Sequence, residues 1–107
     1  MRQLRFLKLP NAGLTNQSAA KLQTLVYLEA LTLSSNAISD ELDWIQKLTN
    51  LRMLSMARTQ VSEKVLPLLE HLTQLRLIDF YSTNIPSEAV QKFLKSRSGC
   101  KEAAYFG

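Results

Sequence analysis

One spacing of apolar residues recurs four times along the chain, and it constrains the fold more than any other feature. Eleven-residue motifs begin at Leu4, Leu28, Leu51 and Leu75, which are 24, 23 and 24 residues apart. They read LRFLKLPNAGL, LEALTLSSNAI, LRMLSMARTQV and LRLIDFYSTNI, and they align without a gap. Positions one, four, six and eleven are apolar in every copy. A period of this length is typical of stacked repeats, in which each unit is one supersecondary element.

The segment after each motif has a different, helical spacing. Apolar residues lie five, eight and eleven positions after the motif, or one position earlier in the second repeat: Ala19, Leu22, Leu25; Leu42, Ile45, Leu48; Leu66, Leu69, Leu72; and Val90, Phe93. Steps of three and four place such residues on one stripe of a helix. Trp44 flanks this stripe and is expected to pack between adjacent helices, the alternative being a lateral apolar patch with Leu68. Each repeat is therefore predicted to be a short strand over motif positions three to five, a turn and a short helix.

The motif resembles that of the leucine-rich repeat family, L-x-x-L-x-L-x-x-N-x-L, and the resemblance covers essentially the whole chain. The repeats of 23 and 24 residues are most similar to the compact bacterial members. The chain departs from the family at position nine, where only Asn36 is Asn and the other copies have Ala12, Thr59 and Thr83. Thr can make part of the family's side-chain hydrogen bonds to the backbone, and Ala cannot. The resemblance implies an α/β fold, a right-handed solenoid with a parallel sheet on the concave side and short helices on the convex side.

A chain of 107 residues with this pattern is predicted to form a single domain, residues 1–107. Its four repeats begin at Leu4, Leu28, Leu51 and Leu75, and residues 99–107 are predicted to be an irregular closing strand. The first repeat has no cap in the sequence, because only three residues precede Leu4. Either further repeats precede it in a longer protein, or something packs against it.

Several classes of protein are disfavoured by the composition. The longest apolar run, residues 65–69, is far shorter than the roughly 18 residues of a membrane span, and the N-terminus has no apolar core of a signal peptide. Cys100 is the only cysteine, so a cytoplasmic location is expected. The net charge of +4 lies mostly in the last sixteen residues, where four basic residues face one acidic residue. With no basic stripe over the body of the chain, neither nucleic acid nor a membrane is an expected partner.

The candidate binding surface consists of the strand positions that are predicted to face solvent, namely three, five, seven and eight. From these rows we predict contacts with a protein or peptide through the concave face at Phe6, Lys8, Met53, Ser55, Arg58, Leu77, Asp79 and Tyr81. The alternative for the position-three row is a partly exposed wedge without a binding role. Position two adds a row of charges, in which Glu29 can pair with Arg5 and Arg52, and which is interpreted as a solvated ladder with Arg76.

No combination of residues indicates catalysis, a metal or a cofactor. His71 has no second histidine or cysteine nearby, Cys100 is expected to be a buried cap residue, and Asp40, Glu41 and Asp43 suit a helix start better than a metal site. The sequence therefore predicts a non-catalytic module that binds an as yet unknown protein or peptide. The alternative is a structural segment of a longer repeat protein, or a solenoid that self-associates as a homodimer through its uncapped N-terminal end.

Overall fold

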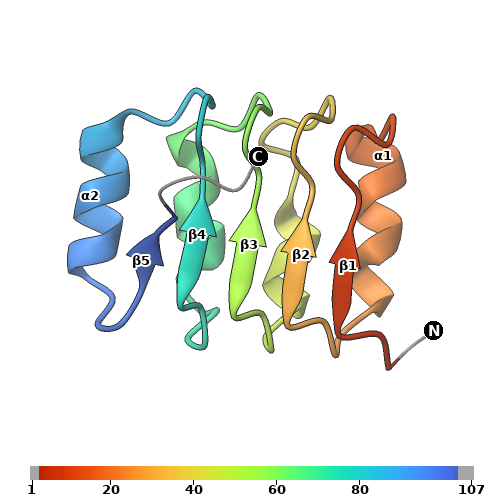
Figure 1. Cartoon of the computed structure of the whole chain (residues 1–107), viewed down its shortest axis with the longest axis horizontal. Coiled ribbons are helices and arrows are strands. Elements are labelled where there is room, and N and C mark those ends of the chain that lie inside the picture. Colours follow the sequence, from red (N-terminus) through yellow and green to blue (C-terminus); the bar gives the residue numbers. More distant parts are fainter. Residues whose placement is uncertain (1–2, 104–107) are drawn as a thin grey trace.

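The computed structural model describes residues 3–103, which form a curved stack of strand–turn–helix units (Figure 1). The first four strands are β1 (Phe6–Lys8), β2 (Ala30–Thr32), β3 (Met53–Ser55) and β4 (Leu77–Asp79). Each occupies motif positions three to five, as the sequence predicts. The pleat explains this placement, because positions four and six are apolar and point to the same side of the strand.

The sheet is parallel and in register throughout the described residues, with strand order β1-β2-β3-β4-β5. The pairing places Phe6 beside Ala30, Ala30 beside Met53, and Met53 beside Leu77. A fifth strand, β5 (Lys101–Glu102), pairs with β4 in the same sense. It belongs to the predicted closing segment, of which residues 104–107 lie outside the described residues. Because the register is kept, equal motif positions form continuous rows across the sheet.

Helical segments cover one face of the sheet, on the convex side of the stack (Figure 1). They are α1 (Asn16–Ala19) with η1 (Ala20–Thr24), η2 (Asp43–Lys47), η3 (Glu63–Leu69) and α2 (Ser87–Lys95). Within residues 3–103, only α2 is an α-helix of more than one turn, and the η segments are 3-10 helices. The spacing in the sequence does not separate the two types. A 3-10 helix advances about 2.0 Å per residue against 1.5 Å in an α-helix, so it spans the convex side with fewer residues.

Every repeat turns away from the sheet at the same position. Motif position eight is left-handed in all four copies, with φ of 50° at Asn11, 58° at Ser35 and Arg58, and 56° at Ser82. Residues other than glycine rarely adopt this conformation. Its recurrence at one position identifies it as part of the repeat geometry rather than a local distortion.

The core is the row of motif leucines together with the helical stripe. Leu31, Leu33, Leu54 and Met56 have no exposed surface, and Trp44 is 7% exposed. Trp44 therefore packs in the core, as predicted, and forms no lateral patch. None of the helices in residues 3–103 is long and apolar enough to span a bilayer.

Asn36 connects the first two repeats through its side chain. Its Oδ1 accepts hydrogen bonds from the N–H groups of Ala12 and Leu14, both at 3.0 Å, and its Nδ2 donates to the carbonyl oxygens of Leu9, Leu33 and Ser34. At the same position, Thr59 and Thr83 each donate one hydrogen bond to the carbonyl three residues earlier, at 2.7 and 2.8 Å. Threonine thus makes part of the asparagine's bonds, as the sequence predicts.

Candidate binding surface

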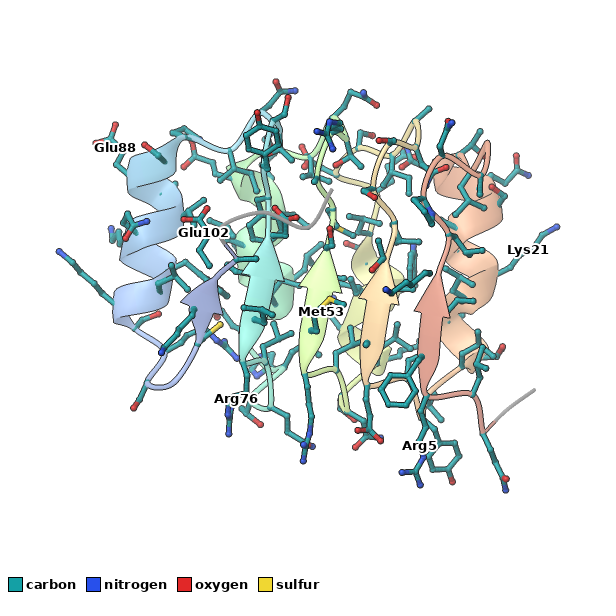
Figure 2. All side chains as sticks on the ribbon, viewed as in Figure 1. Arg5, Lys21, Met53, Arg76, Glu88 and Glu102 are labelled. Carbon is teal, nitrogen blue, oxygen red and sulfur yellow. The ribbon has the colours of Figure 1, made fainter. Side chains whose placement is uncertain are left out.

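The concave face carries an apolar row at motif position three. Phe6 is 68% exposed at the end of the sheet, while Ala30, Met53 and Leu77 are partly buried. Met53 lies on the face of β3 opposite the helices (Figure 2). Since the strands are in register, these four side chains form one row. Two predicted contact residues, Met53 and Leu77, are therefore neighbours in it.

Three of the four residues in the position-five row are buried, which corrects the expectation that this row faces solvent. Ser55 is 1% exposed and Asp79 is 2% exposed, whereas Lys8 in the same row is exposed. Asp79 is held within the fold, because its Oδ1 accepts from the N–H of Tyr81 at 3.1 Å and its Oδ2 accepts from the Ser55 hydroxyl at 3.4 Å. Short polar side chains that form hydrogen bonds with neighbouring groups do not extend far from the sheet into solvent. Ser55 and Asp79 therefore offer a partner little surface.

At positions eight and seven, two of the predicted contact residues, Arg58 and Tyr81, lie together. The Arg58 guanidinium lies over the Tyr81 ring, with 5.3 Å from its carbon to the ring centroid. A backbone hydrogen bond of 2.8 Å from the Arg58 N–H to the Tyr81 carbonyl fixes the two residues side by side. Both side chains are exposed, Tyr81 by 55%. At position seven of the middle repeats, Ser34 and Ala57 are buried, contrary to the expectation for that row.

The eight predicted contact residues thus fall into four groups of two. Arg58 and Tyr81 form an exposed pair, Met53 and Leu77 form a partly buried neighbouring row, and Phe6 and Lys8 lie on β1 at the other end of the sheet. The remaining two, Ser55 and Asp79, are buried. We call Met53, Arg58, Leu77 and Tyr81 the concave patch.

The other chemically notable residues have structural surroundings. His71 is exposed, and no group of three potential metal ligands occurs within residues 3–103. Burial raises the pKa of the Cys100 thiol, although the positive charges of Arg97 and Arg76 act in the opposite direction. Asp40 accepts hydrogen bonds from the N–H and hydroxyl of Ser62 at 2.7 and 2.6 Å. It therefore connects the second repeat to the third instead of capping η2, which corrects its interpretation as a helix-start acid.

A second surface, which we call the strand-start edge, extends beyond the solvated ladder of charges that the sequence predicts at position two. It consists of the residues just before each motif and those at position two: Val26, Tyr27, Asn50, Gln74, Arg5, Glu29, Arg52 and Arg76. Figure 2 shows Arg5 and Arg76 along this edge, where the strands begin. Glu29 pairs with Arg5 at 3.3 Å and has no ion pair with Arg52 in the described structure, so the ladder is paired only at one end. The sequence does contain a signal for this surface. The two residues before the second motif are apolar, Val26-Tyr27, whereas the third and fourth motifs are preceded by the polar pairs Thr49-Asn50 and Thr73-Gln74.

Comparisons with known proteins identify the fold. No family model matches the sequence, and no curated protein matches it. Among solved structures, the chain is similar to an internalin from Listeria monocytogenes, with a TM-score of 0.68 and 23% identity over 82% of this chain and 25% of that one. It is also similar to a leucine-rich repeat protein of Leptospira interrogans, with a TM-score of 0.53 and 20% identity over 78% of this chain and 27% of that one. The chain thus spans about a quarter of each match, and its fold is that of an α/β leucine-rich repeat solenoid.

Proposed function

We propose that the chain is a non-catalytic protein-binding module that holds a protein or peptide segment on the concave patch. The observation that carries the proposal is the exposed Arg58–Tyr81 pair beside the row of Met53 and Leu77. Tyrosine and arginine are the residue types most enriched at interface hot spots, and Met is also enriched at interfaces. The bacterial character of the repeats is part of the proposal, and the two bacterial structures support it.

The geometry of the pair supports a binding role on energetic grounds. The backbone bond between Arg58 and Tyr81 and the stacking of their side chains hold both residues in place before a partner arrives. Ordering a flexible side chain costs about 0.5 to 1.5 kcal/mol on binding, and a side chain already held in place avoids part of that cost. The patch is therefore preorganised at its polar end.

An alanine scan with a displayed library of random 12-residue peptides tests this proposal. Peptides selected on the immobilised chain are expected to bind the Tyr81→Ala and Leu77→Ala variants at least about tenfold more weakly. Lys21→Ala and Lys92→Ala on the convex side are the matched controls and should leave affinity unchanged. Selected peptides that depend on the convex residues and not on the concave patch would contradict the proposal.

Self-association through the N-terminal end is a second candidate, and one observation favours it. Leu4, Leu7, Leu9 and Leu14 remain partly exposed, although their counterparts in the middle repeats have no more than 1% exposure. The outer edge of β1 also has no partner strand among residues 3–103. Sedimentation of the unmodified chain across concentrations should then show dimers at high micromolar concentration. A strictly monomeric species with little binding of a hydrophobic dye would rule this candidate out.

A further inference from the structure

The strand-start edge has an apolar pair that the fold itself does not require. Val26 is 40% exposed and Tyr27 is 52% exposed, and neither belongs to the core cluster. The third and fourth repeats have polar residues at the same two positions. There, the Asn50 side chain donates to the Val26 carbonyl at 3.0 Å and the Gln74 side chain donates to the Thr49 carbonyl at 3.4 Å. Polar residues therefore serve the fold at these positions, and the exposed apolar pair needs another explanation.

Tyr27 lines two hollows on this edge. One is a groove of about 300 Å³, which Tyr27 lines together with Arg5, Glu29, Asn50, Arg52 and Gln74. The other is a hollow of about 510 Å³, which it lines with Gln3, Thr24 and the apolar Val26. An apolar side chain of a partner can pack beside Tyr27 while a polar group enters the adjoining groove.

The charges at the edge determine what kind of polar group fits. Arg5, Arg52 and Arg76 face a single acid, Glu29, and its carboxylate contacts Arg5. Arg76 donates through one guanidinium nitrogen to two backbone carbonyls, and Arg52 has no ion pair in the part of the chain that the structure describes. Arg52 and Arg76 are neighbours on paired strands, since Met53 pairs with Leu77. Like charges on adjacent strands repel each other, and a carboxylate placed beside them removes that repulsion.

We propose that the strand-start edge is a second interaction surface, which takes an acidic peptide segment with an apolar side chain. The apolar side chain packs on Val26 and Tyr27, and a carboxylate reaches Arg52. Tyr27 and Arg52 belong to neighbouring repeats, whose strands lie about 4.8 Å apart, and an extended peptide advances about 3.3 Å per residue. The separation corresponds to one to two residues, and because alternate side chains of an extended peptide point to the same side, the carboxylate lies about two residues from the apolar side chain. This surface is separate from the concave patch, and the two proposals can fail independently.

The test uses the chain's own third repeat as its control. In a Val26→Thr, Tyr27→Asn double variant, the second repeat carries the residues that the third repeat has at these positions. Its thermal unfolding midpoint should stay within about 2 °C of the parent value. A displayed library of random 12-residue peptides is selected on the parent chain and counter-selected on the double variant. We expect survivors that carry an acidic residue about two positions from an apolar one.

Individual surviving peptides give the quantitative readout. They should bind the double variant at least about tenfold more weakly than the parent, and Arg52→Gln should weaken them by about threefold or more. Tyr81→Ala, in the concave patch, should leave their affinity unchanged.

Four outcomes would overturn this proposal. They are the absence of any survivor, survivors without acidic residues, dependence of the survivors on Tyr81, and a double variant that loses its fold. A fifth would be self-association of the parent that the double variant abolishes, because the occupant would then be a second copy of the chain.

Discussion

The two ends of the solenoid bury their terminal repeats to different extents. In the last repeat, Ile78, Phe80 and Phe93 are at most 8% exposed. Their counterparts in the first repeat, Leu7, Leu9 and Leu22, stay partly exposed. Both repeats are apolar at these three positions, so the difference lies in what adjoins them.

Beyond β4, the described chain provides a short but well-bonded cover. β5 extends the ladder, Cys100 is buried beside it, and the Arg97 guanidinium donates to the carbonyl oxygens of Leu69, Glu70 and Leu72 at the end of η3. At the N-terminal end of the solenoid, Pro10 follows β1 and has no N–H. The outer edge of the sheet therefore has one fewer backbone donor with which another strand could pair. Among the described residues, the C-terminal end of the solenoid is therefore covered by backbone pairing of β5, by the hydrogen bonds of Arg97 and by the buried Cys100.

The largest expected effect compares the same leucine in a middle and a terminal repeat. Leu54→Ala removes a side chain with no exposure and should lower the free energy of unfolding by about 2 to 5 kcal/mol. Leu7→Ala, at the same motif position, should cost about half as much, because Leu7 is partly exposed. Denaturant unfolding of both variants measures the difference. Equal losses would show that the N-terminal repeat is as well covered as the middle of the stack.

The next prediction concerns the hydrogen bonds that the Asn36 side chain makes to the first repeat. Asn36→Ala leaves the N–H groups of Ala12 and Leu14 without their acceptor, and should cost about 3 kcal/mol. Thr59→Ala is the matched control at the same motif position, with one hydrogen bond and an expected cost of about 1 kcal/mol. Both values come from denaturant unfolding. If the two substitutions cost the same, Asn36 does not hold the first repeat in place.

At the C-terminal end, Arg97 is expected to make the equivalent contribution. Arg97→Ala removes a charged donor from three carbonyl groups, and should lower the free energy of unfolding by about 2 kcal/mol. Arg52→Gln is the control, because Arg52 is exposed and should change stability by no more than about 0.5 kcal/mol. Thermal or denaturant unfolding of the two variants measures the difference in their stability. A neutral Arg97→Ala would mean that β5 alone closes this end.

The strands were predictable because one motif repeated four times specifies both their position and their register. The helix type was not, since apolar steps of three and four occur in both 3-10 and α-helices. The burial of Ser55 and Asp79 was missed for another reason. Alternation along a strand identifies the face of a side chain but not how much of it is buried, and it does not reveal the hydrogen bonds that Ser55 and Asp79 make. Tyr27 was missed because it lies outside the motif, where only a comparison between repeats reveals it.

The smallest expected effect tests whether the C-terminal cover stays closed in solution. Burial raises the pKa of the Cys100 thiol above its ordinary value, and the charges of Arg97 and Arg76 only partly oppose this. The folded chain therefore keeps the thiol protonated to a higher pH than the unfolded chain does. The associated stability is present below the unfolded thiol's pKa and is lost as the pH rises through and above it.

Because the thiolate is the reactive form, Cys100 at pH 8 should react with an aromatic disulfide at least about tenfold more slowly in the native chain than in urea. The rate should keep rising at a pH where the unfolded thiol has levelled off. Arg97→Ala separates the two effects of that residue, because losing its charge raises the pKa further and slows the reaction, whereas opening the cover speeds it. We expect faster reaction, since Arg97 holds the end of η3 against this part of the chain. A slower reaction would mean that Arg97 acts on Cys100 only through its charge, and that backbone pairing of β5 is what covers this end.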